Sequence, residues 1–312
     1  MTSRSDSGWG GSAANGYPIL EGRTIAMLEV SRHETFADYS VRCLDRLSED
    51  LVSGVEEVQC YSAALSLQFL AALGALGHRT VLDPAGGSRE TWLSLRTALD
   101  TGAAIFTVAA AAKGVVPVRM DDRTVRLDTT GPVYYANAKN WLTTLWLAIV
   151  ARDAGVIERL ARFSIVALRQ SGTAAPEYSY DMVRMLQLFF RGERGADVAL
   201  GAALEAGKPA ELADRYEREV ANQLRFPEME LFHYLLSDST GERFNKALAN
   251  ALTGHLDYWS VDDDRLDSPS GYIALGPLAL AVMAQDAGIA ISVRSEYLPS
   301  ALLDGTALTE HG

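Results

Sequence analysis

The sequence predicts a mostly α-helical fold, arranged as a single-domain multi-helix bundle or as an irregular stack of helix pairs with one small β-hairpin. Apolar residues recur at three- and four-residue intervals through most of the 312 residues, which is the spacing of one face of an α-helix. Clusters of Gly, Pro and Asp separate these segments at short intervals, as turns between helices would.

The first third of the chain predicts a set of helices. Residues 34–52 place apolar side chains on one helical face and charged side chains on the other. Residues 56–76 are nearly all apolar, so we expect a central helix with residues 60–73 buried. Residues 89–112 predict one long helix or two shorter ones interrupted near Gly102, since glycine disfavours helix interiors.

One stretch departs from the helical pattern. Residues 115–128 alternate on either side of the turn-like "DDRT", which predicts a small β-hairpin. Pro117 would place its strand at an edge, because proline cannot donate a hydrogen bond to a neighbouring strand. An isolated hairpin is only marginally stable, so this one is expected to pack against helices.

Helical periodicity resumes after the hairpin. The apolar stripe of residues 134–153 predicts a helix whose segment 141–149 is buried. Residues 209–224 repeat an apolar residue every fourth position. Residues 228–237 and 241–256 predict a further pair of helices.

The most apolar run lies near the C-terminus, at residues 272–284. A membrane span needs about 20 consecutive apolar residues, and this run is shorter. Pro277 suits a first helical turn and Gly288 suits a helix end. The run therefore predicts a helix inside the protein core, with residues 275–284 buried. The following "IAISV" predicts a short strand, and "SEYLPSALL" a final turn that docks on the core.

The predicted organisation is one domain with short extensions. Residues 1–20 are rich in Gly and Ser and predict a disordered lead-in without the apolar segment of a signal peptide. Residues 21–303 predict the helical domain, and residues 304–312 a flexible tail. The two cysteines lie far apart without a C-x-x-C motif, which is typical of reduced thiols in a cytoplasmic protein.

The chain is acidic, with a formal net charge of −12. This charge argues against nucleic-acid binding, which usually needs a basic patch, and it permits a basic protein partner. No membrane partner is predicted, and the sequence does not indicate an oligomeric state. The densest cluster of acidic residues consists of Asp262, Asp263, Asp264 and Asp267. It predicts either a solvated loop or an acidic rim that faces a basic partner.

Motifs for catalysis or metal binding are absent from the sequence. Neither G-x-S-x-G nor H-E-x-x-H occurs, and no glycine-rich fingerprint follows a strand, so no cofactor is predicted. Glu230 and His233 have the Glu-x-x-His spacing of di-iron bundles, but those bundles need two copies and further carboxylates. We therefore predict no metal.

A pocket between helices is the alternative site. Aromatic and amide side chains can line such a pocket, although aromatics at helical spacing are more typical of a core. The residues concerned are Tyr134, Tyr135, Asn137 and Trp141. A general acid or base beside it would be His233, with Glu230, or His255, because histidine titrates near neutral pH.

The C-terminal third resembles the Immunity protein 49 family. The first similar block is residues 232–259, through Leu235, Leu236, Asp238, Phe244, Ala247, Leu248 and His255. The second block is more specific: an "LG-x-LALA" helix at 275–281, then "VRS-x-YLP-x-x-LL" through Val293, Arg294, Ser295, Tyr297, Leu298, Pro299, Leu302 and Leu303. Residues 140–153 give weaker similarity.

The resemblance implies a cytoplasmic actinobacterial immunity protein that is encoded beside a secreted polymorphic toxin and neutralises this toxin by binding it. It implies a cognate toxin as partner and no catalytic residues. The alternative is a helical enzyme or small-ligand-binding protein, recruited into actinobacterial secondary metabolism, with a pocket between helices.

Overall fold

A computed structural model describes residues 27–111, 113–120, 123–208, 212 and 214–312. The fold is mostly α-helical with one small antiparallel hairpin, which confirms the predicted fold class. The predicted lead-in at residues 1–20 lies outside the described residues.

The N-terminal helices pack around a central one. They are α1 (Ala37–Cys60), α2 (Leu65–Leu82) and α3 (Arg89–Ala109). Helix α2 contacts both of the others. Helix α3 continues through Gly102, so the uninterrupted form of the prediction is the right one. A Cβ at Gly102 would lie 2.9 Å from Cε2 of Phe69, so the glycine lets α3 approach α2 closely.

The first half of helix α2 is buried on one face only. Leu65, Phe69 and Ala72 lie in the core, whereas Leu67 and Leu70 are exposed, so the predicted burial of residues 60–73 is wrong for the outer face. By length and composition the segment Ser62–Leu82 could cross a membrane, but 61% of its apolar window is buried inside the protein. Core helices of soluble proteins pass the same test.

The hairpin lies where the alternation predicted it. Strand β2 (Val115–Met120) pairs antiparallel with β3 (Arg123–Asp128). The inward side chains of Val118, Val125 and Leu127 are buried, and β2 packs against α3. The helix supplies the support that an isolated hairpin would lack.

The middle of the chain contributes the core helix α4 and further helices around it. These are α4 (Ala138–Val150), α5 (Ala154–Ala161), α6 (Ile165–Arg169), α7 (Glu177–Phe190) and α8 (Ala196–Ala206). Residues 141–149 of α4 are buried as predicted, apart from Thr143. Trp141 is fully buried, and its indole N–H donates to the Leu160 carbonyl at 3.1 Å.

A change of helical register separates the next elements. They are α9 (Arg215–Val220), a π-helical turn (Ala221–Arg225), α10 (Phe226–Ser237) and α11 (Glu242–Trp259). Pro227 has no N–H for the Gln223 carbonyl four residues earlier, which accounts for the π turn at this point. Gly254 makes room for that carbonyl, because a Cβ there would lie 2.8 Å from the Gln223 oxygen.

Asp238 organises the turn between α10 and α11. The side chain of Asp238 is 2% exposed, and its carboxylate accepts the N–H groups of Thr240, Arg243 and Phe244 at 2.8–3.1 Å. Burial alone would raise the pKa of this carboxyl, but the hydrogen bonds outweigh burial and lower the pKa to about 2. Asp238, which lies in the first block of family resemblance (residues 232–259), is therefore a structural cap of α11.

The C-terminal segment closes the core. It forms α12 (Asp263–Leu266), α13 (Leu275–Asp286), β4 (Val293–Arg294), α14 (Ser300–Leu303) and α15 (Thr306–His311). Residues 276–282 of α13 are all buried, which confirms the predicted core helix. A short helix, α15, occupies most of the predicted flexible tail, where Nε2 of His311 lies 2.9 Å from the Gly87 carbonyl oxygen.

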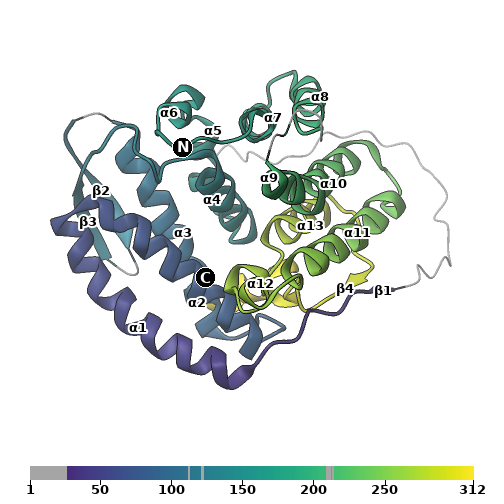
Figure 1. The fold of residues 1–312 in the computed structure, drawn as a ribbon, viewed down its shortest axis with the longest axis horizontal. Coiled ribbons are helices and arrows are strands. Elements are labelled where there is room, and N and C mark those ends of the chain that lie inside the picture. The colour runs from purple at the N-terminus through teal and green to yellow at the C-terminus, as the bar shows by residue number, and fades with distance from the viewer. Residues whose placement is uncertain (1–26, 112, 121–122, 209–211, 213) are drawn as a thin grey trace, which may run out of the picture.

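A short strand pairing joins the two ends of the described chain. Strand β1 (Leu28–Glu29) runs parallel to β4, and of the strand predicted from "IAISV" only Val293 lies in β4. Figure 1 shows α1, α2, α3 and the hairpin on one side, and α9, α10 and α11 on the other. Helices α4 and α13 contact each other between these groups.

Candidate functional site

The acidic residues singled out in the sequence form a short helix in place of the predicted loop. Asp262 caps α12, since its Oδ1 accepts the Arg265 N–H at 2.9 Å. All four carboxylates are exposed. Asp263, Asp264 and Asp267 make no ion pair with another described residue. They leave negative charge available at the surface.

Arg265 fixes α12 to the helices beside it. Its Nη2 lies 3.0 Å from Oε2 of Glu219 on α9, and hydrogen bonds from Arg265 and Arg215 lower the pKa of Glu219. Its guanidinium carbon lies 4.3 Å from the ring centre of Tyr258 on α11. The acidic helix is therefore mounted on a fixed support.

The structure gathers the predicted pocket residues around the start of α4. Asn137 caps this helix, and Oδ1 of Asn137 accepts the Asn140 N–H at 2.9 Å. Tyr135 is buried and donates to the Ser62 carbonyl, and burial raises the pKa of its hydroxyl to about 12. Tyr134 is 56% exposed, whereas Trp141 lies in the core. These four side chains anchor the helix, and neither of the two hollows described below includes them.

The residues of the alternative acid–base site lie on two helices. Glu230 and His233 are exposed on α10. His255 on α11 is buried, with Nε2 2.9 Å from the Gly271 carbonyl oxygen. Burial lowers the pKa of His255 to about 4, which is far from the near-neutral value that suits a proton shuttle. No cluster of three or more potential metal-ligating side chains occurs among the described residues.

The structure contains a buried cluster of histidine and tyrosine rings that the sequence did not predict. Nδ1 of His33 lies 2.7 Å from the hydroxyl of Tyr297, whose ring centre is 4.7 Å from that of His255. The ring of Tyr272 lies 5.6 Å from His33 and 5.5 Å from His78. Burial lowers the pKa of His33 and of His78. These contacts join segments that are distant in sequence, and no local pattern signals them.

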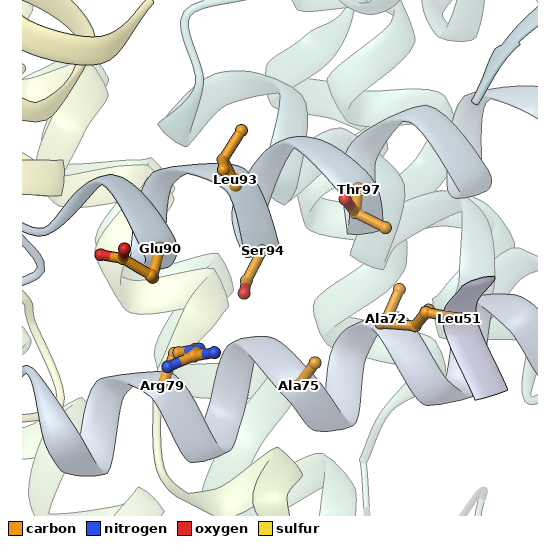
Figure 2. Close-up of a pocket in the computed structure, with 8 residues that line it drawn as sticks. All are labelled: Leu51, Ala72, Ala75, Arg79, Glu90, Leu93, Ser94 and Thr97. Atoms are coloured by element: carbon orange, nitrogen blue, oxygen red, sulfur yellow. The ribbon is translucent and has the colours of Figure 1, made fainter. Parts of the chain in front are cut away.

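The surface also has a groove between α2 and α3, which the sequence did not reveal. Figure 2 shows Ala72, Ala75 and Arg79 of α2 facing Glu90, Ser94 and Thr97 of α3, with Leu51 of α1 at one end. Leu93 of α3 also lines the groove. The groove holds about 170 Å³. A second, shallower hollow lies on the outer face of α1 and is lined by Ser48, Glu49, Val52, Ser53 and Glu56.

Comparison with known proteins agrees with the resemblance seen in the sequence. The sequence profile described as Immunity protein 49 matches residues 83–302. This range runs from the residue after α2 to α14, and so contains α4, the acidic helix and the buried α13. No curated protein and no solved structure is similar enough to match. Because the profile covers most of the chain, the protein belongs to the Immunity protein 49 family, and this membership implies immunity to a toxin.

Proposed function

We propose that the protein neutralises a cognate toxin in the cytoplasm by binding it directly, without catalysing a reaction. Family membership supports the link to a toxin. The observation that favours binding is the exposed acid of α12, held in place by the Arg265 contacts to α9 and α11. A fixed charged surface steers an oppositely charged partner and excludes wrong ones.

Co-expression tests this function. The toxin encoded beside the gene is expressed in a host cell with and without the protein, and an affinity tag on the protein recovers whatever binds it. We expect the protein to restore growth and the toxin to co-purify with it. Restored growth without any recovered toxin, or no protection at all, would contradict direct neutralisation.

Neutralising the acidic helix should slow the encounter with the toxin. In a variant with Asp262, Asp263, Asp264 and Asp267 all changed to Asn, we expect association at low ionic strength to be on the order of 10-fold slower. The salt dependence of the association rate should also flatten. The fold should persist, because asparagine caps a helix about as well as aspartate. Stopped-flow kinetics over a range of salt concentrations measure both effects.

A matched control variant removes the same number of negative charges from another side of the molecule. Its four exposed carboxylates lie on the side of the molecule formed by α5, α7 and α8, and they are Glu158, Glu193, Asp197 and Glu205. Changing them to Gln or Asn should slow association much less. Equal rates for the two variants would show that only net charge matters and that α12 is not the steering surface.

A further inference from the structure

The groove between α2 and α3 has an apolar floor and one charged end. Ala72 and Ala75 on α2 are almost fully buried at its base, and Leu93 on α3 forms a wall while 44% exposed. The groove exists because alanine side chains leave the space open that longer ones would fill. In Figure 2, Arg79 and Glu90 face each other across it. Neither makes an ion pair with another described residue.

The hollow on α1 is connected to the groove through consecutive residues, because Leu51 lines the groove and Val52 lines the hollow. Val52 lies there with 71% of its surface exposed. Glu49 and Glu56 line the same hollow, and their spacing of seven residues places them on one helical face, two turns apart. Neither carboxylate is paired with another described residue. An exposed apolar side chain between unpaired carboxylates is suited to a partner segment that is apolar at its centre and basic on its flanks.

The size of the groove limits what it can hold. Pockets for small molecules measure about 300–1,000 Å³, whereas this groove holds about 170 Å³. That space suits one inserted side chain. Protein interfaces concentrate their binding energy in such places, where one side chain of the partner fills a pocket and loses its water.

We propose that this groove receives an apolar side chain of the toxin, while neighbouring Lys or Arg residues of the toxin pair with Glu49 and Glu56 on α1. This inference rests on the proposed function and assigns it a docking surface. The acidic helix α12 then steers the encounter, and the groove determines how long the complex lasts.

The family match covers one wall of the groove and not the other. The match begins at residue 83, so Leu93 and Glu90 on α3 lie inside it. Leu51, Ala72 and Ala75 lie outside it. Helix α3 therefore supplies the wall that lies within the family match, and α1 and α2 supply the wall that lies outside it.

Aspartate substitutions with matched controls test the groove. The test variants are Leu93→Asp and Val52→Asp. The controls are Leu236→Asp, where leucine is 49% exposed compared with 44% for Leu93, and Val198→Asp, where valine is 72% exposed compared with 71% for Val52. We expect Leu93→Asp to weaken binding of the toxin at least about 30-fold, mainly through faster dissociation, and the controls to change it less than about 3-fold.

A charge exchange extends the test without touching the groove itself. Glu49→Lys with Glu56→Lys should slow association and shorten the lifetime of the complex, since both lysines would repel the basic flanks of the partner. Thermal melting of each variant checks folding. Val52→Asp keeps the test valid if Leu93→Asp fails to fold, because Val52 lies on the outer surface of α1.

The possible outcomes distinguish a failure of the groove proposal from a failure of the proposed function. If the wild-type protein binds the toxin, and both Leu93→Asp and Val52→Asp bind it equally well, the docking proposal is wrong and direct neutralisation stands. If the wild-type protein itself does not bind, the proposed function fails first. If Leu93→Asp instead dissociates a dimer of this chain and leaves toxin binding unchanged, the occupant is a second copy, and the proposal is overturned.

Discussion

Glu228→Ala is expected to lower the free energy of unfolding by about 3–5 kcal/mol. Nη1 of Arg225 lies 3.0 Å and 2.8 Å from the two carboxylate oxygens of Glu228, and the side chain of Glu228 is 5% exposed. The carboxylate fills the space beside Gly276 on α13. Removing it leaves the Arg225 guanidinium charged and unpaired in a largely buried position, which is far more costly than losing a surface ion pair.

A double substitution distinguishes the unpaired charge from a simple loss of packing. Arg225→Met with Glu228→Leu keeps most of the volume and removes both charges, so the double variant should unfold within about 1–2 kcal/mol of the wild type. Urea unfolding followed by circular dichroism measures all three proteins. A loss below 1 kcal/mol for Glu228→Ala, or a double variant less stable than the single one, would contradict this explanation.

Acidification from pH 7 to pH 4 should cost about 3 kcal/mol of stability through His255 alone. Its pKa is lowered to about 4 in the folded protein, against about 6.5 in an unfolded chain. Between these values the unfolded state binds a proton that the folded state excludes, so stability is complete above pH 6.5 and is lost as the pH falls. His33 and His78, whose pKa values are also lowered, add to the loss.

His255→Gln provides the control for this pH dependence. The glutamine amide can donate to the Gly271 carbonyl that His255 contacts, but it does not titrate. Unfolding by urea at several pH values between 4 and 7 should therefore show a smaller decline for the variant, by about 2 kcal/mol or more. Parallel curves for the two proteins would show that His255 does not govern acid stability in this range.

Much of the fold was predictable where local pattern and burial coincide. Helix α13 is apolar on every side and lies in the core, and the alternation around residues 121–122 became the hairpin. The outer face of α2 was not predictable, because Leu67 and Leu70 follow the same apolar pattern as the buried Leu65. At Gly102 the sequence left one long helix and two shorter ones open, because glycine weakens a helix locally, whereas the structure uses this glycine for close packing.

Of the candidate surfaces, too, some could be predicted from the sequence and others could not. The cluster of acidic residues at 262–267 could be found from the sequence, because its members are close neighbours along the chain. Its attachment to α9 could not, since Arg265 contacts Glu219, which is 46 residues away in the sequence. The groove arises from the spacing between α2 and α3, and the pairing of His33 with Tyr297 joins opposite ends of the described chain. Such features depend on tertiary packing.

Titration of the purified toxin with the purified protein tests the central claim most directly. Toxin activity is measured as the protein is added, and the toxin is then released by denaturation and weighed by mass spectrometry. Neutralisation by binding predicts that activity falls in proportion to the protein added, that inhibition is complete only when protein matches toxin, and that the released toxin has an unchanged mass. Full inactivation by a small fraction of that amount, with a lasting change in the mass of the toxin, would show catalysis and contradict the account.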